Sequence, residues 1–330
     1  MSKRYWRPGA RVYWRSPGSS QIGLDPRCAV VIDDLDPVEQ SLLERLPHLA
    51  GEADPAVLAR GAGRTPVLRL LDRLEAAGYL VPDPPPHGGA DVRYWQLADL
   101  AGQQRPRSRG GSTLQIQGLD QVGLRVARIV AQAGVGALLV TDEGPVLADD
   151  LSTDGYRATD LGHPREQRAL ARLRPGYPKT SFTVRPGTRP DLVLLIEHGA
   201  ADPVRARPLM REDLPHLPVL IRELDVVVGP LVRPGAGPCL RCLDLARSDA
   251  DSRWPAVATQ VTARPPVGTE SVLSWFAASL AAHQAMAWLD GRTTAVDGVS
   301  LEVAATYPVP RHRRWQVHPR CGCTAAALTG

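Results

Sequence analysis

Four of the five cysteines in the sequence are spaced as ligands for a single metal ion. Cys239 and Cys242 form a C-x-x-C motif, and Cys321 and Cys323 form a C-x-C motif near the C-terminus. Two such pairs, brought together from distant parts of a chain, are typical of a closed tetrahedral Zn²⁺ site that stabilises a fold and takes no part in catalysis. Disulfide bonds are the alternative, but the N-terminus lacks the apolar segment of a secretory leader, and cytoplasmic thiols stay reduced. The cysteines therefore predict a structural zinc site in a cytoplasmic protein.

The composition is that of a globular protein large enough for two domains. The chain has 330 residues, of which 43% are hydrophobic and 22% charged, and its formal net charge is only +4. No apolar run approaches the roughly 18 to 20 residues of a membrane-spanning helix. These properties predict a protein with proper hydrophobic cores and no membrane segment.

Residues 1–83 have the pattern of three short strands followed by three helices. The strands are expected at Ala10–Arg15, Gln21–Leu24 and Cys28–Ile32, with turn-forming residues between them. Helical spacing begins at Asp36-Pro37, continues from about Asp54 to Arg60, and recurs from Thr65 to Gly78, where Val67, Leu70, Leu71 and Leu74 share one face. This order predicts a winged-helix domain over residues 1–83. The Pro-rich stretch after it predicts a linker over residues 84–111, with one short helix at Asp91–Ala101.

Short motifs in this first domain match a known peptide-binding module. They are Arg7-Pro-Gly9, Gln21-Ile-Gly23, Val30-Val-Ile32 and Ala77-Gly-Tyr-Leu-Val81. Together they resemble the PqqD-like domain, the recognition element of enzymes that modify ribosomally made peptides (RiPPs). The resemblance implies that a leader peptide adds as an extra strand beside Val30, Val31 and Ile32 and lies against the third helix. The helix side chains that would select the peptide are Leu68, Arg69, Asp72 and Arg73.

A DNA-binding winged helix is the rival interpretation of the same pattern. Such a domain needs a surplus of positive charge on its recognition helix. Residues 1–83 contain 11 Lys and Arg against 11 Asp and Glu. The charge balance therefore favours peptide over nucleic acid as the partner.

Residues 112–330 have an α/β pattern. Strands are expected at 114–118, 137–142, 180–184, 191–196, 218–221 and 226–228, and helices at Asp120–Ala133 and from about Glu270 to Leu289. The alternation predicts a Rossmann-like sheet of parallel strands covered by helices on both faces. The stretch from Ala250 to Thr269 has no regular period and is expected to be a loop.

Several motifs recur in a fixed order along this second domain: Gly118…Gly123, Ala133–Asp142, Leu161–Arg165 and the two cysteine pairs. In order and spacing they resemble the ThiF/MoeB family, the adenylating fold of ubiquitin-type activating enzymes. The resemblance implies a nucleotide site, a zinc site and pairing into a homodimer. A PqqD-like domain joined to a ThiF-like one resembles the ThiF-like leader-binding partners of YcaO cyclodehydratases in azol(in)e peptide biosynthesis.

The first strand-to-helix turn departs from that of an active family member. Active members carry glycines in the middle of this turn, whereas this chain has Gly118-Leu-Asp-Gln-Val-Gly123, so Asp120 would hold a carboxylate near the triphosphate. Two like charges at contact distance in a poorly screened site repel by several kcal/mol. Phosphate binding is therefore expected to be lost.

The other implied nucleotide positions are changed as well. Asp142, which would hold the ribose, is kept, but the family's arginine is replaced, with Arg157 near enough to compensate. Arg165 replaces a lysine, and His198 or Glu197 stands in place of a metal-binding aspartate. We expect a vestigial site that binds neither ATP nor Mg²⁺, formed by the residues at the matching positions: Gly118, Asp120, Gly123, Asp142, Arg157, Arg165 and His198.

No cysteine lies between Cys242 and Cys321, where thioester-forming activating enzymes carry their nucleophile. The chain is therefore predicted to be a non-catalytic adaptor: the first domain captures the leader of a precursor peptide, and the second docks the modifying enzyme, a YcaO-type cyclodehydratase. Two alternatives stay open at this point. One is an active adenylyltransferase that activates a peptide or small-protein carboxylate, and the other is a winged-helix regulator with a vestigial enzyme body.

Overall fold

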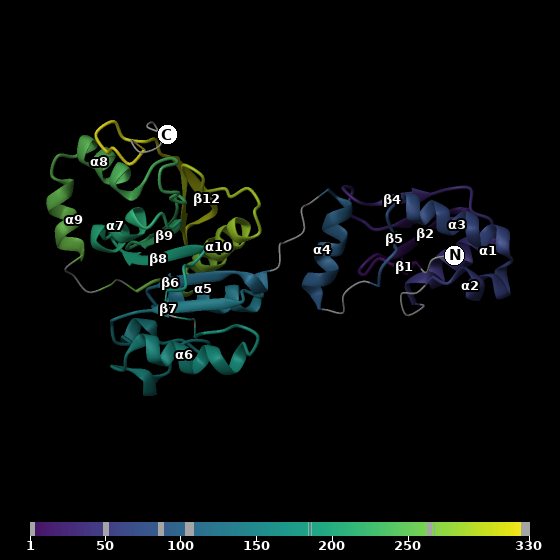
Figure 1. The fold of residues 1–330 in the computed structure, drawn as a ribbon, viewed down its shortest axis with the longest axis horizontal. Coiled ribbons are helices and arrows are strands. Elements are labelled where there is room, and N and C mark those ends of the chain that lie inside the picture. The colour runs from purple at the N-terminus through teal and green to yellow at the C-terminus, as the bar shows by residue number, and fades with distance from the viewer. Residues whose placement is uncertain are drawn as a thin grey trace. The chain divides into compact units, whose positions relative to one another are not determined.

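The chain folds into two compact units, residues 1–106 and 107–330, in the computed structural model of Figure 1. The structure describes residues 4–48, 53–84, 89–102, 109–183, 185, 187–262, 266 and 268–324. Among these residues, no helix is both long and apolar enough to span a bilayer.

The N-terminal unit has a three-stranded antiparallel sheet packed against three helices. The sheet order is β2 (Val12–Ser16), β3 (Ser19–Ile22) and β4 (Val30–Ile32), and the helices are α1 (Pro37–Arg45), α2 (Pro55–Ala62) and α3 (Arg64–Ala76). A second, two-stranded sheet pairs β1 (Tyr5–Trp6) with β5 (Leu80–Val81). The core joins Ile22 and Ile32 of the sheet to Leu42 and Leu43 of α1 and to the four predicted apolar residues of α3.

Capping explains where α1 begins, as the sequence predicts. The Asp36 side chain accepts a hydrogen bond from Glu39 N at 2.8 Å, and Glu39 Oε2 accepts one from Asp36 N at 3.0 Å. This reciprocal capping box satisfies backbone donors that the first turn of a helix leaves free. Pro37 occupies the first helical turn, where its missing N–H has no cost.

Helix α4 (Ala90–Leu100), from the stretch predicted as a linker, packs on the N-terminal unit. The buried Arg7 guanidinium donates to Gln96 O at 2.8 Å and to Asp99 Oδ2 at 3.1 Å. Leu97 and Leu100 lie against the core of the unit. A buried guanidinium needs acceptors, and α4 supplies them.

The C-terminal unit is built on a seven-stranded sheet of order β12-β11-β10-β9-β8-β6-β7. Its parallel part consists of β6 (Thr113–Gln117), β7 (Ala137–Thr141), β8 (Leu192–His198) and β9 (His216–Ile221). The antiparallel part consists of β10 (Asp225–Val228), β11 (Val299–Ala304) and β12 (Tyr307–Arg314). The expectation of parallel strands alone was wrong, because the connection from β9 to β10 is too short for a crossover and permits only a hairpin.

Helices cover both faces of this sheet, as predicted (Figure 1). Side chains alternate along β8, so Leu194 and Ile196 pack with α5 (Gln121–Gln132) and α10 (Ser271–Leu289). Val193 and Leu195 pack on the other face, with α7 (Pro203–Arg211) and α8 (Leu240–Ala250). Helix α6 (Arg165–Gly176) lies near α5 and β7.

Two local predictions in this unit were wrong. Residues 180–184 do not form the expected strand: Ser181 makes only an isolated bridge to Ala137, and residue 184 lies outside the described part of the chain. The expected loop after Ala250 contains helix α9 (Trp254–Thr262). The start of α9 is held by Trp254, whose ring lies 5.1 Å from the Arg247 guanidinium and whose Nε1 donates to Asp244 at 3.4 Å. Such tertiary contacts leave no periodic signal in the sequence.

Candidate functional site

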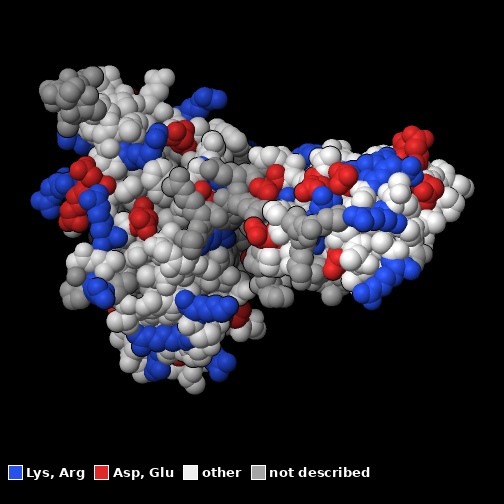
Figure 2. All heavy atoms as spheres, turned by 45° about the vertical axis from the view of Figure 1, so that its right-hand side comes forward, with Lys and Arg blue, Asp and Glu red and all other residues white. Residues whose placement is uncertain are grey.

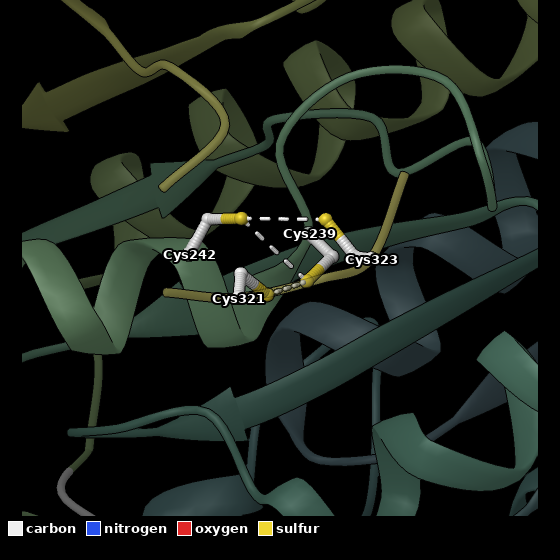
Figure 3. A group of neighbouring side chains, drawn as sticks. All are labelled: Cys239, Cys242, Cys321 and Cys323. Carbon is white, nitrogen blue, oxygen red and sulfur yellow. Dashed lines mark hydrogen bonds between the residues drawn. The ribbon is translucent and has the colours of Figure 1, made fainter. Parts of the chain in front are cut away.

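The four predicted metal ligands converge on one point, as Figure 3 shows. Cys239 caps the N-terminus of α8 and Cys242 lies in its first turn, while the other two come from the C-terminal segment. Cys239 Sγ lies 3.5 Å from Cys321 Sγ and 3.9 Å from Cys242 Sγ, and Cys242 Sγ lies 3.5 Å from Cys323 Sγ. These distances exceed the ~2.05 Å of a disulfide bond. Four sulfurs bound tetrahedrally to one Zn²⁺ at about 2.3 Å would be about 3.8 Å apart, so the cluster is compatible with a metal site.

The surroundings of the cluster attach the C-terminal segment to α8. The Cys321 N–H donates to His318 O at 2.9 Å, and the His318 side chain pairs with Asp249 of α8 at 2.8 Å. Burial raises the pKa of the Cys239 thiol, and burial also raises the pKa of Cys323 to about 11. A cation at the centre of the cluster is what would favour thiolates here.

The strand proposed to accept a leader peptide stands at an edge of its sheet. β4 pairs with β3 on one side, in the register Ile22 to Val30 and Ser20 to Ile32. Val31 is 41% exposed, Val30 is half-buried and Ile32 is buried. An edge strand offers unpaired backbone groups to an incoming chain.

Of the helix residues predicted to select the peptide, one contacts the segment just after this strand, and two pair elsewhere. Arg69 pairs with Glu39 at 2.5 Å and with Asp36 at 3.0 Å, and Arg73 donates to Asp33 O, just after β4, at 2.5 Å. Asp72 instead pairs with Arg4 at 3.1 Å, and Leu68 is half-buried. On the face of this unit shown in Figure 2, acidic and basic side chains are interspersed.

Five of the seven predicted nucleotide residues line a cavity of about 670 Å³ in the C-terminal unit: Gly118, Asp120, Asp142, Arg165 and His198. It lies at the carboxyl ends of β6, β7 and β8, where the chain leaves β6 for β7 on one side and later returns to β8 on the other. Such a switch point is where open α/β sheets bind ligands. Its titratable lining residues include Asp120, Asp142, Arg165, Glu197, His198 and Arg205.

Asp120 occupies the N-terminus of α5 with its own carboxylate. Its Oδ1 accepts from Gly123 N at 2.8 Å, and its Oδ2 lies 2.8 Å from His198 Nε2. Burial alone would raise the Asp120 pKa, but hydrogen bonding by His198 and by Gly123 N outweighs it and holds the pKa below its usual value. The helix terminus that would attract a phosphate is thus already neutralised by an internal anion.

The two predicted glycines of this turn are required by packing. A Cβ on Gly118 would lie 2.5 Å from Ile196 O, and a Cβ on Gly123 would lie 2.1 Å from Gly118 O. Gly118 also has a φ of +102°, which favours glycine. Their presence therefore has an explanation that needs no nucleotide.

The remaining predicted positions are used within the protein or lie away from the cavity. Asp142 Oδ2 accepts from Leu119 N at 2.6 Å and Oδ1 from Gly144 N at 2.7 Å. Arg165 lies 3.7 Å from Asp142 and 2.8 Å from Asp150. Arg157 is exposed at the start of a 3₁₀ turn. It is not among the described residues that line the cavity.

Glu197 is the residue whose importance the sequence alone did not reveal. It is 4% exposed; its Oε1 accepts from Asp202 N at 3.2 Å and lies 3.6 Å from Arg205 Nη1. Its Oε2 is buried and has no hydrogen-bond partner among the described residues. Burial raises the pKa of Glu197 to about 7. The sequence offered Glu197 only as an alternative to His198, because it does not show which of two neighbouring side chains faces which side of a strand end.

The mixed sheet, its two helical layers and the switch-point cavity define a Rossmann-like α/β protein with a separate N-terminal unit.

No protein-family model and no curated protein matches the sequence. Among solved structures, the microcin C7 biosynthetic enzyme MccB in complex with N-formylated MccA is similar with a TM-score of 0.66 at 12% identity, over 98% of this chain and 99% of that chain. E. coli MccB with ATP has a TM-score of 0.64 at 13% identity, over 97% and 99%. PaaA has a TM-score of 0.65 at 14% identity, over 93% and 99%. At these identities the likeness establishes the fold, which is the ThiF-like one expected from the sequence.

Proposed function

We propose that this chain is a non-catalytic adaptor that captures the leader of a ribosomal precursor peptide and presents it to a modifying enzyme of the YcaO cyclodehydratase type. The observation that carries the proposal is the Asp120 carboxylate at the N-terminus of α5, held there by His198. A triphosphate placed over this turn would meet a buried negative charge where an adenylating enzyme needs bare N–H groups. The solved MccB structures that share this fold, several of them with MccA, support a peptide partner.

The peptide would bind to the N-terminal unit at the edge of β4, beside α3. Val31 of that strand is exposed, and the Arg73 guanidinium donates to Asp33 O, just after the strand. Backbone hydrogen bonds would supply affinity, and side chains of α3 would supply selectivity. Holding the leader raises the local concentration of the attached core peptide at the partner enzyme, which requires no acid, base or nucleophile from this chain.

We further propose that the four cysteines hold a structural Zn²⁺. The buried thiols and their spacing fit a closed site with no ligand position left for water. Thiolate ligation also fits the reducing conditions of the cytoplasm, where we expect the protein to act.

Proline substitutions in β4 are expected to locate the peptide-binding edge. Successive N–H groups of a strand point to opposite edges, so one of Val30→Pro and Val31→Pro removes a donor from the free edge and the other removes one from the pairing with β3. The variant that loses the outward donor is expected to bind leader peptide about tenfold more weakly or worse, with little loss of stability. Calorimetry measures the affinity of each variant for a synthetic leader peptide, whose sequence is taken from a short reading frame that neighbours the gene. If both variants fold and bind the leader peptide as tightly as the wild type, the proposed binding site at the edge of β4 is contradicted.

The alternative function, an active adenylyltransferase, is favoured by the size of the cavity and by the MccB fold, which has been solved with ATP. We expect no saturable Mg·ATP binding by calorimetry and no ATP–pyrophosphate exchange above background. Exchange comparable to that of a working adenylating enzyme would replace the adaptor proposal with this one. Asp120→Gly is expected to lower thermal stability, because it removes the cap of α5 and leaves His198 without its partner.

A further inference from the structure

The cavity at the switch point has room for a ligand, but its lining is acidic. Its described lining residues include five carboxylates against two guanidinium groups and one imidazole. The carboxylates are Asp120, Asp142, Glu143, Glu197 and Asp202, and the basic groups are Arg165, His198 and Arg205. A volume of about 670 Å³ is within the range of small-molecule sites. The cavity is therefore large enough for a ligand and has a surplus of negative charge.

The basic groups of the lining already lie beside carboxylates, although one of their atoms, His198 Nδ1, has no hydrogen-bond partner among the described residues. His198 lies 2.8 Å from Asp120, Arg165 lies 3.7 Å from Asp142, and Arg205 lies 3.6 Å from Glu197. Arg165 is shared further with Asp150, at 2.8 Å. An incoming anion would have to take these cations away from carboxylates that are themselves largely buried.

Glu197 gives a further reason to expect a ligand here, independent of the overall charge of the lining. Its side chain is more than nine-tenths buried and lines the cavity, and its Oε2 accepts no hydrogen bond from the described residues. A buried acceptor without a donor is costly, and few folded proteins leave one without a reason. A ligand that brings an N–H group to this oxygen would satisfy it.

We propose that this cavity binds a cationic nitrogen group, a guanidinium or a primary ammonium, that donates a hydrogen bond to Glu197 Oε2. Such a group matches both the acidic surplus of the lining and Glu197 Oε2, which, with His198 Nδ1, is one of two buried side-chain atoms among the described lining residues that lack a hydrogen-bond partner. Guanidinium and ammonium groups have only donors, so they compete for none of the N–H groups that Asp120 and Asp142 accept from the backbone. Among the described residues, the cysteine cluster is the group whose ligand atoms converge as closely as a metal ion requires, so a divalent cation is the weaker fit to this cavity.

The cation can come from a free small molecule or from a basic side chain of a bound peptide. The two sources share the same chemistry, and two guanidinium probes separate them: agmatine, and the peptide acetyl-Gly-Arg-Gly-amide. This inference goes beyond the adaptor role and does not depend on it. Leader capture is assigned to the N-terminal unit, so failure of one proposal leaves the other standing.

The experiment measures binding of each probe to the full-length protein at pH 8 by calorimetry. The wild type is expected to bind at least one guanidinium probe saturably and to bind neither inorganic phosphate nor Mg·ATP. Tighter binding of the peptide probe assigns the site to a side chain, and tighter binding of agmatine assigns it to a free molecule. Glu197→Gln keeps the size of the side chain and removes its charge, and is expected to weaken binding about tenfold or more. Glu223→Gln, an exposed residue outside the cavity lining, is the matched control and is expected to change affinity by less than about twofold.

Three outcomes overturn the proposal. One is that the wild type binds neither guanidinium probe, which needs no variant and so does not depend on the folding of Glu197→Gln. Another is that phosphate or Mg·ATP binds and is displaced by neither probe. The last is that a folded Glu197→Gln protein binds the probes as tightly as the Glu223→Gln control.

Discussion

Removing the metal from the cluster of Cys239, Cys242, Cys321 and Cys323 is expected to unfold the region around α8 and the C-terminal segment. The apparent binding free energy of a structural Zn²⁺ is about 10 to 16 kcal/mol in zinc-finger peptides, as large as the whole stability of many domains at about 5 to 15 kcal/mol. Here the cluster joins residues about 80 positions apart in sequence, with sequence separations of 81 and 82 for its two closest sulfur pairs. The local core that remains is small, with few apolar residues from β8, α7 and α8. Thermal unfolding before and after treatment with a chelator, together with elemental analysis, measures the effect.

The fifth cysteine provides a matched control for this prediction. Cys321→Ser removes one ligand, whereas Cys28→Ser makes the same chemical change at a residue outside the cluster. We expect Cys321→Ser to lose bound zinc and to melt well below the wild type, and Cys28→Ser to keep both zinc and melting temperature. A metal-free protein that melts at the same temperature as the untreated one would show that the cysteines do not hold a structural metal.

The cysteine cluster was predictable from the sequence because the C-x-x-C and C-x-C pairs have the spacing of metal ligands, whatever the surrounding fold. Their spacing alone identified the residues that the fold brings together. The starts of α1 and α2 were predictable for a similar reason, since Asp36 and Asp54 cap them locally and need no distant partner. The alternation within β6 and the continuous apolar run of β8 likewise follow from partial burial of one sheet face in β6 and from burial of both faces in β8.

Features that depend on distant contacts were not predictable in the same way. Strand β11, to which β12 adds as the next strand, gains its partner only when the chain returns to β10, 71 residues after that strand ends, as the pairing of Val228 with Leu301 shows. Helix α9 depends on contacts of Trp254 with α8. The helix predicted at Asp91–Ala101 was confirmed as α4, but its packing on the N-terminal unit depends on Arg7, more than 80 residues earlier. In each case a tertiary contact decides a feature that the local sequence does not show.

In the candidate cavity, too, some features follow from the local sequence and others depend on distant contacts. The sequence identified Asp120 as an obstacle to phosphate, because a carboxylate in that turn is unfavourable in any arrangement. It did not predict that His198, 78 positions later, would pair with Asp120, because this requires β6 and β8 to be neighbours in the sheet. The unsatisfied oxygen of Glu197 depends in turn on the placement of α7, which supplies Arg205 and the N–H of Asp202 just before it.

Replacing Glu197 by glutamine is expected to stabilise the protein at pH 8 and to have a much smaller effect at pH 5. Burial raises the pKa of Glu197 from 4.5 to about 7. Between these two values the folded state binds more protons at this residue than the unfolded state does. The free energy of unfolding therefore falls as pH rises from about 4.5 to about 7, and the stabilisation is absent above that range. One pKa unit corresponds to about 1.4 kcal/mol, so the cost of ionising Glu197 at pH 8 is at most about 3 kcal/mol.

Glutamine mimics the protonated acid, because it keeps one oxygen for the Asp202 N–H and has no charge to bury. We expect Glu197→Gln to exceed the wild type by about 1 to 3 kcal/mol in free energy of unfolding at pH 8, and by less than about 1 kcal/mol at pH 5. Urea unfolding at both pH values measures this, with Glu223→Gln, an exposed residue, as the control that should follow the wild type at both. Equal stability of Glu197→Gln and wild type at pH 8 would mean that Glu197 is not a buried, costly carboxylate. A stability gain on removing its charge would show that the buried charge is costly, which fits a carboxylate kept for binding as in the cavity proposal.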